Sequence, residues 1–232
     1  MKGSVNGGAG IVVAIDGAAG TGKSSVAKKL ATSLRWDYLE TGALYRGVAL
    51  LMDREGKDSK DIDAASSFAM EMEFESRYTN LGWKNFINGM DVTTLLRHEK
   101  ISELASFISS DAKVRSILLD YQRKYGKEKG VVLEGRDIGT VVFPDALLKF
   151  YFDADEEVRI KRRLKELKEN NLGCNLENVS IQLKKRDDRD RTRADSPLKR
   201  SENSILVDTT DKSLEEVYEF VFNKVKKHLI SG

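Results

Sequence analysis

The feature that most constrains the fold of this chain is a glycine-rich loop near the N-terminus, set between a strand pattern and a helix pattern. Residues 17–24 read Gly-Ala-Ala-Gly-Thr-Gly-Lys-Ser and match G-x-x-x-x-G-K-[ST] in full. The apolar, β-branched run 11–16 precedes the loop and predicts a buried strand. Val26, Leu30 and Leu34 follow at the spacing of one helix face. A strand, a glycine loop and a helix in this order open a parallel α/β unit.

The residue types of this loop suit a polyphosphate. Glycines let backbone N–H groups converge on phosphate oxygens, and a helix N-terminus favours an anion. Lys23 would place a cation on the β- and γ-phosphates, and the Ser24 hydroxyl can ligate Mg²⁺. The pattern predicts a triphosphate-binding loop of nine residues: Gly17, Ala18, Ala19, Gly20, Thr21, Gly22, Lys23, Ser24 and Ser25.

A phosphate loop alone leaves several protein classes open, among them GTPase switches, ATPases and small-molecule kinases. The guanine-reading pattern N-K-x-D is missing from the sequence, since Asn223-Lys224-Val225-Lys226 fails at its last position. At 232 residues the chain is also short for a motor ATPase. A kinase for a small acceptor and a nucleotide-binding switch without catalysis both remain.

The rest of the chain predicts one α/β domain that carries two additional elements. Residues 73–79 and 83–88 alternate with period two around Asn80-Leu81-Gly82, which predicts an inserted β-hairpin. A polar break at 169–178 separates two charged helices, at 155–168 and 184–193. Core strands are expected at 11–16, 36–39, 131–133, 148–152 and 205–207. Other helices are expected at 24–34, 41–54, 60–72, 100–107, 113–125 and 213–229, the last with a Ser213/Glu216 capping box.

The composition limits the kinds of partner that this protein can be expected to bind. The 39 basic and 37 acidic residues nearly cancel, which argues against a general nucleic-acid coat. No apolar run is long enough to span a membrane, and residues 1–10, rich in glycine, read as a flexible leader without the apolar stretch of a signal peptide. Cys174 is the single cysteine, so no intramolecular disulfide can form. We therefore expect a cytoplasmic protein that binds neither nucleic acid nor membrane.

Three further groups of charged residues are candidates for a second anion site. Thr41 and Arg46 lie about one turn apart at a predicted helix start, and Glu134-Gly-Arg136-Asp137 follows a predicted strand. The carboxyl ends of parallel strands meet at one cleft, so these side chains should face it. In the run 184–193, Arg186, Asp190 and Arg193 share one helix face. Surface ion pairs, a solvated turn and an exposed charged helix are the alternative interpretations.

Five segments, taken together and in order, resemble the bacterial cytidylate kinases, which make CDP from CMP and ATP. They are 17–25, 40–46, 134–145, 186–193 and Ser196-Pro197-Leu198. The stretch E-G-R-D-I-G-T-V-V-F-P-D-A, from Glu134, is highly specific to that family, whereas the phosphate loop is shared far more widely. The resemblance runs from Ile11 to about Leu229.

The resemblance implies the P-loop nucleoside monophosphate kinase fold, with a five-stranded parallel sheet flanked by helices. A single domain over 11–232 would comprise a core (11–67, 101–161 and 179–232), a monophosphate-binding β-hairpin insertion at about 68–100 and a lid at about 162–178. It also implies ATP as donor, CMP or dCMP as acceptor, Mg²⁺ as cofactor and a monomer. A relative with another acceptor, such as UMP, is the alternative enzyme.

Residue by residue, the resemblance implies eight CMP-binding positions: Thr41, Arg46, Ser106, Arg115, Arg136, Asp137, Arg186 and Asp190. Arg46 and Arg136 would hold the phosphate, and Arg186 and Asp190 the ribose. Catalytic charge neutralisation would fall to Lys23, Arg136, Arg193 and a lid arginine, Arg163 or Arg162. Glu40 and Glu134 stand where many relatives have aspartate, which keeps the carboxylate.

The chemistry of cytosine agrees with this assignment. Cytosine offers an N4 amino donor beside an N3 acceptor, and uracil inverts both. A carboxylate such as Asp137 can accept from N4, while Arg115 and Ser106 can donate to N3 and O2. These three side chains would therefore select cytosine over uracil.

Overall fold

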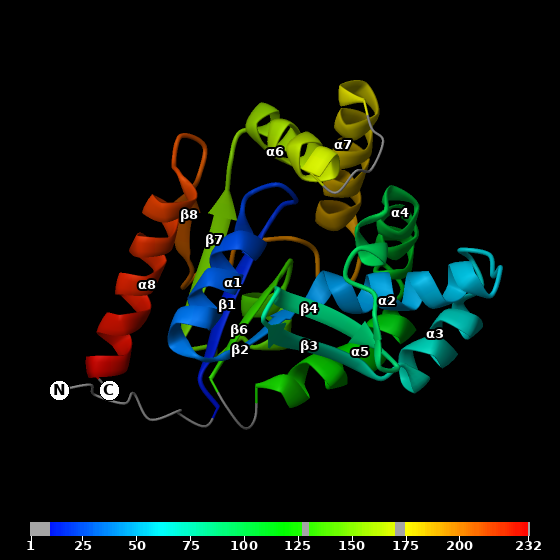
Figure 1. Ribbon diagram of the computed structural model, residues 1–232, viewed down its shortest axis with the longest axis horizontal. Coiled ribbons are helices and arrows are strands. Elements are labelled where there is room, and N and C mark those ends of the chain that lie inside the picture. The colour runs from blue at the N-terminus through cyan, green and yellow to red at the C-terminus, as the bar shows by residue number, and fades with distance from the viewer. Residues whose placement is uncertain (1–9, 127–129, 170–174, 232) are drawn as a thin grey trace.

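A five-stranded parallel sheet forms the centre of the molecule (Figure 1). The computed structural model describes residues 10–126, 130–169 and 175–231. The strands follow the order β2-β6-β1-β7-β8, and every neighbouring pair is parallel. Their bounds are β1 Val12–Gly17, β2 Asp37–Glu40, β6 Val131–Gly135, β7 Leu148–Asp153 and β8 Ile205–Asp208. The fold class and the five core strands predicted from the sequence are confirmed.

Helices cover both faces of the sheet and make a three-layered core (Figure 1). The side chains of β1 alternate, so that Val13 and Ile15 face α1 (Lys23–Leu34) and α8 (Leu214–Ser231), while Val12 and Ala14 face the opposite layer. That layer contains α2 (Thr41–Arg54), α4 (Glu99–Ile108) and α5 (Ala112–Tyr125). Because β1 is buried on both faces, its first four residues, 12–15, are all apolar.

A second sheet lies over 74–91, where the sequence predicted a two-stranded hairpin. After α3 (Ile62–Glu71) come β3 (Phe74–Thr79), β4 (Gly82–Ile87) and β5 (Met90–Asp91), an antiparallel sheet of three strands. The third strand was missed because it has two residues, both exposed. Trp83 of β4 donates from Nε1 to Thr32 Oγ1 of α1 at 2.9 Å, and its ring meets Tyr38 edge-on at 5.3 Å. These contacts seat the second sheet on the core.

Two helices rise above the carboxyl ends of the strands, α6 (Glu156–Glu169) and α7 (Leu176–Thr192) (Figure 1). They pack through a small apolar cluster and a buried pair of Arg159 with Asp187. Helix α7 begins at Leu176, earlier than the charged run 184–193 suggested, because Asn175 caps it by accepting the Asn178 N–H; Val179 and Leu183 are the buried apolar residues of its first half. Residues 170–174 of the predicted polar break, Cys174 included, and residues 1–9 of the predicted leader lie outside the described residues.

The alternative of an exposed charged helix at 184–193 is wrong for one face of α7, where Asp187 and Asp190 are buried. Arg193 lies just beyond the helix end and reaches the same region from the following loop.

The predicted capping box at the start of α8 is present, since Ser213 and Glu216 exchange hydrogen bonds.

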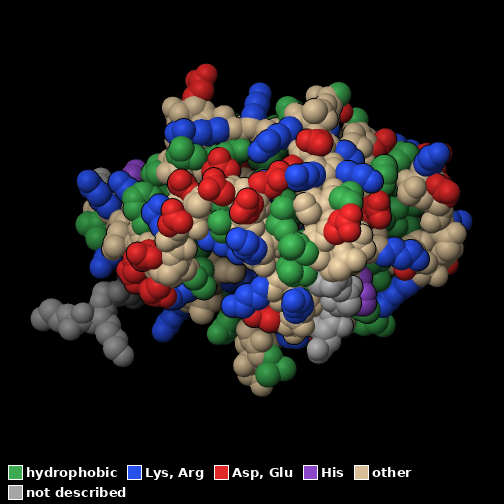
Figure 2. Space-filling view, turned by 90° about the horizontal axis from the view of Figure 1, so that it is seen from above, with side chains coloured by type: hydrophobic (Ala, Val, Ile, Leu, Met, Phe, Trp, Pro, Cys, Tyr) green, Lys and Arg blue, Asp and Glu red, His purple; other side chains and the backbone are tan. Residues whose placement is uncertain are grey.

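The surface carries both signs of charge. In the view from above, basic and acidic side chains are interspersed (Figure 2). Among the helices of the described ranges, none combines the length and the apolar character needed to cross a membrane.

Candidate active site

One large cavity, of about 1000 Å³, opens beside the carboxyl ends of β1, β2 and β6. Its wall includes all eight predicted acceptor residues, together with Lys23, Arg162, Arg163 and Arg193. Of the phosphate loop, Ala19 to Ser25 line the cavity, while Gly17 and Ala18 do not. Residues that the sequence spreads over 19–193 are thus brought to one space, as the rule for parallel sheets predicts.

The phosphate loop turns sharply from β1 into α1. A Cβ on Gly17 would lie 2.2 Å from the Phe152 carbonyl oxygen, and Gly22 holds a φ of +87° as the cap of α1. The Lys23 ammonium donates to the Ala18 carbonyl at 2.6 Å and lies 3.4 Å from Thr21 Oγ1. Burial, and after it the Arg136 guanidinium, lower the pKa of Lys23 to about 7. The Glu134 and Asp16 carboxylates oppose this effect on the Lys23 pKa only in part.

Ser24 and Glu134 form the part of the site that fits a divalent cation. Ser24 Oγ donates to Glu134 Oε1 at 2.6 Å, and the Tyr38 hydroxyl reaches the same oxygen at 3.3 Å. A hydroxyl and a carboxylate are the hard oxygen ligands that Mg²⁺ prefers. No group of three metal-ligating side chains occurs in the described ranges. From the sequence, Glu134 was expected only as part of a charged turn near an anion site and not beside a metal, although its place at the end of β6 was a usable signal.

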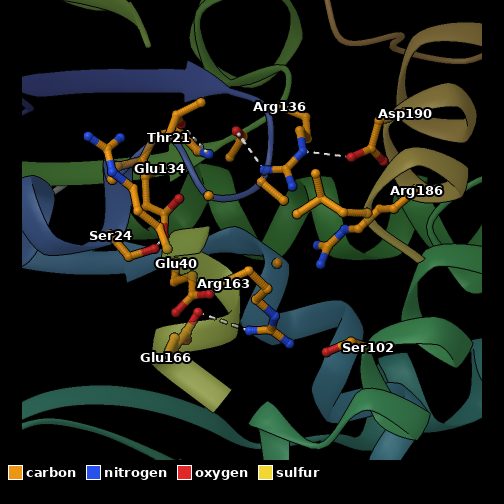
Figure 3. Close-up of a pocket in the computed structure, with 18 of the residues that line it drawn as sticks. Thr21, Ser24, Glu40, Ser102, Glu134, Arg136, Arg163, Glu166, Arg186 and Asp190 are labelled. Carbon is orange, nitrogen blue, oxygen red and sulfur yellow. Dashed lines mark hydrogen bonds and ion pairs between the residues drawn. The ribbon is translucent and has the colours of Figure 1, made fainter. Parts of the chain in front are cut away.

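Arginines from β6 and α7 gather on the opposite wall. Arg136 Nε donates to Asp190 Oδ2 at 2.7 Å, with Arg186 beside them (Figure 3). Burial opposes the charge on Arg136, but Asp190 raises its pKa overall. Burial and the neighbouring Arg136 together lower the pKa of Arg186 to about 10. Two guanidinium groups with one carboxylate leave a net positive charge, so this wall suits an anionic group.

A second acidic side chain lies near this wall, at the start of the short π-helical turn η2 (Ile138–Val142). Asp137 pairs with Arg115, and Arg193 Nη2 lies 3.8 Å from its other oxygen. Ser106 Oγ is buried with no hydrogen-bond partner in the part of the chain that the structure describes. Burying a polar group without a partner is costly, so Ser106 is available for a ligand.

The start of α2 supplies the remaining predicted acceptor residues. Arg46 pairs with Glu40, and Thr41 Oγ1 donates to the Glu134 carbonyl at 3.0 Å. The Thr41 hydroxyl is therefore committed to the backbone of β6, whereas Arg46 keeps a buried Nε without a partner in the described ranges.

The two arginines predicted for the lid, Arg162 and Arg163, have different surroundings on α6. Arg163 donates to Glu99 of α4 at 2.9 Å. It also donates to Glu166 at 3.0 Å (Figure 3). Arg162 instead bonds Thr209, whose hydroxyl donates to the Thr21 carbonyl. Arg163 thus links α6 to α4, whereas Arg162 contacts the phosphate loop indirectly, through Thr209. Glu99 and Glu166 were not singled out from the sequence, because their role depends on a contact between two distant helices.

Comparison with known proteins places these residues in a family. The family model "Cytidylate kinase" matches residues 13–227. A protein named cytidylate kinase from Caldanaerobacter subterraneus is 43% identical over 94% of this chain and 96% of its own. One of that name from Citrifermentans bemidjiense is 40% identical over 96% of each chain, and one from Coxiella burnetii is 39% identical over 93% of this chain and 92% of its own.

Solved structures share the fold at low sequence identity. An uncharacterized protein from Eubacterium ventriosum gives a TM-score of 0.53 at 16% identity, over 94% of this chain and 99% of its own. A gluconokinase from Sinorhizobium meliloti gives 0.50 at 13% identity, over 96% of this chain and 95% of its own. The match of the family model and the identity to full-length relatives agree: this chain belongs to the cytidylate kinase family.

Proposed function

We propose that this protein transfers the γ-phosphoryl group of ATP to the phosphate of CMP or dCMP. The observation that carries this proposal is the shared cavity, with a phosphate loop on one wall and Arg136, Arg186 and Asp137 on the other. A phosphoryl donor and an anionic acceptor can meet there without any residue acting as a strong base. Positioning and charge neutralisation carry most of the chemistry of such a transfer.

On the donor side, the loop amides and Lys23 hold the β- and γ-phosphates. Ser24, with Glu134 beside it, would hold Mg²⁺ directly or through water. When bound, Mg²⁺ would offset negative charge on the phosphate oxygens. Thr209 steadies the loop from β8 through the Thr21 carbonyl, at 3.0 Å.

On the acceptor side, Arg46 and Arg136 hold the phosphate of CMP, and Arg186 and Asp190 hold the ribose. Asp137 accepts from cytosine N4, while Arg115 and Ser106 donate to N3 and O2. Arg193, beside Asp137, and Arg163 on the lid neutralise the transferring group. Arg163 must leave Glu99 and Glu166 to do so, so its present ion pairs describe a resting arrangement.

A coupled ADP-release assay tests the function. CMP and dCMP should support turnover with ATP and Mg²⁺, whereas UMP, AMP, GMP and a reaction without acceptor should give far less. A preference for UMP would identify a kinase for another acceptor. Nucleotide binding without ADP release would identify a non-catalytic switch.

We further propose that the enzyme works as a cytoplasmic monomer, without nucleic acid. One chain supplies both walls of the cavity, so a second copy is not needed to complete the site. A formal net charge of +2 gives little general attraction to nucleic acid, and a single cysteine suits a reducing compartment.

Two parts of the chain should close over the substrates: the insertion, about 68–100, and the lid, about 162–178. A kinase must exclude water from the transferring phosphoryl group or it hydrolyses ATP. We expect amide hydrogen exchange in β3, β4 and the described parts of α6 and α7 to slow by about tenfold when CMP and a non-hydrolysable ATP analogue bind together. Exchange in β7 is the internal reference. Unchanged rates in both segments would indicate a rigid, preformed site.

Asp190→Ala should weaken the two acceptors together. Its carboxylate bonds Arg136 and lies beside Arg186, and we place it on the sugar. We expect KM for CMP and for dCMP to rise about tenfold, with KM for ATP changed less than about twofold. Asp188→Ala, an exposed change on the same helix, is the matched control. A rise in KM for ATP alone would place this face of α7 on the donor side.

A further inference from the structure

Asp16 links the phosphate loop to residues 136–142, which we call the acceptor loop. None of the motifs recognised in the sequence includes this role for Asp16. It precedes Gly17 at the end of β1, and its neighbour across the sheet on β6 is Gly135, which precedes Arg136. Its side chain is 5% exposed. A carboxyl group is thus buried between the two halves of the site, next to both loops.

Both oxygens of Asp16 accept backbone hydrogen bonds from η2. Oδ1 accepts from the Ile138 N–H at 2.8 Å, and Oδ2 accepts from the Gly139 N–H at 2.7 Å. These are the first amides of the turn, which a helical turn leaves without partners of its own. Asp16 makes no ion pair with any described residue, so these two donors are what satisfies its buried oxygens.

The electrostatics of Asp16 agree with this geometry. The pKa of Asp16 is raised to about 7, with burial as the largest cause, and the N–H groups of Gly139 and Ile138 limit that rise. The Asp137 carboxylate contributes to the rise in the pKa of Asp16, and Lys23 opposes it. A buried carboxyl group in this position is unfavourable without the two amide donors, which indicates that its contact with the turn is specific.

Asp137 does not cap the turn that it begins. An aspartate at this position commonly accepts the N–H of the second or third residue of its own helix. Here the Asp137 side chain makes no capping bond and pairs with Arg115 instead. Asp16 supplies the cap from another strand, which leaves the Asp137 carboxylate free to face the cavity.

We propose that Asp16 is a positioning residue for acceptor recognition: it caps η2 in place of Asp137 and so holds Asp137 toward the base and Arg136 toward the phosphate. This inference rests on the proposed function, in which CMP is the acceptor. Because Asp16 adjoins Gly17, the same side chain also keeps the acceptor loop aligned with the donor loop.

Asp16→Asn tests the cap with little change in shape. Asparagine has one acceptor oxygen, and its NH₂ group would face one of the two backbone N–H groups. We expect kcat/KM for CMP to fall about tenfold and the CMP:UMP preference to narrow about threefold, with KM for ATP within about twofold of wild type. Asp153→Asn, an exposed change at the end of the neighbouring strand β7, should behave as wild type. An unchanged CMP:UMP ratio in folded Asp16→Asn would overturn the proposal.

A double variant separates positioning from a general structural effect. If Asp16 acts through Asp137, adding Asp16→Asn to Asp137→Asn leaves the CMP:UMP ratio of Asp137→Asn unchanged. Independent effects would instead multiply. If the two substitutions change the CMP:UMP ratio by factors that multiply, the proposal is wrong.

Amide exchange in the wild-type protein gives a measurement that needs no variant. The Ile138 and Gly139 amides should exchange slowly by NMR, as buried hydrogen-bonded groups do. If these two amides exchange as fast as those of an open loop, Asp16 does not cap η2, and this conclusion holds whether or not Asp16→Asn folds. If the wild-type protein is inactive on CMP, the proposed function is wrong. If the wild-type protein prefers CMP and Asp16→Asn keeps the same CMP:UMP ratio, only the role of Asp16 is wrong.

Discussion

Replacement of Lys23 with alanine is expected to lower kcat about 10²- to 10³-fold without unfolding the protein. The Lys23 ammonium lies at the start of α1, held by the Ala18 carbonyl within the phosphate loop. It acts where negative charge builds on the transferring group, and a buried, fixed cation is worth more there than one in water. Steady-state ADP release at saturating CMP measures the loss, and thermal unfolding followed by circular dichroism checks the fold.

Lys29→Ala is the matched control for Lys23→Ala. Lys29 stands on the same helix, outside the cavity, where it pairs with Glu215. Its loss should leave kcat within about twofold of wild type, since exposed ion pairs contribute little. A folded Lys23→Ala protein with near-normal turnover would refute the assignment of this loop to the donor phosphates.

Asp137→Asn is expected to narrow the preference for CMP over UMP by about 5- to 150-fold, the range of one unmatched buried hydrogen bond. The structure pairs Asp137 with Arg115, whereas Arg136 bonds Asp190. The carboxylate accepts from cytosine N4 but meets an oxygen when uracil binds, with no proton between them. An asparagine keeps the shape and can turn its NH₂ group toward uracil O4.

The change should fall mostly on kcat/KM for the acceptor, measured for CMP and UMP at saturating ATP. If Asp137 served only to orient Arg115, both acceptors would lose equally and the ratio would stay constant, which would remove Asp137 from base recognition. Asp145→Asn, an exposed change a few residues downstream, controls for the loss of one negative charge near this turn.

The sheet was predictable because β1, β6 and β7 are short apolar runs whose ends are marked by charged or glycine residues. The same signal pointed to Arg136, which directly follows the end of β6, and to Lys23, at the end of the loop that follows β1. The two-residue strand β5 has no apolar pattern to reveal it. The roles of side chains whose partners lie on distant elements could not be predicted either. Glu99 pairs with an arginine of α6, and Asp16 accepts from backbone N–H groups, which every residue except proline has. Local sequence patterns thus predicted the central sheet and the charged residues of the site. The contacts that position those residues became visible only in the folded structure.

The place of β1 inside the sheet has a consequence for how the protein is made. β1 pairs with β6 and β7, and β2 pairs with β6, so the first two strands have no sheet partner until residues 131–153 have been synthesised. At about 5–20 residues per second, that leaves the strand before the phosphate loop unpaired on the ribosome for roughly 7–30 s. An unpaired apolar strand can associate with other chains during this interval. A nascent chain stalled before β6 should therefore bind chaperones rather than nucleotide.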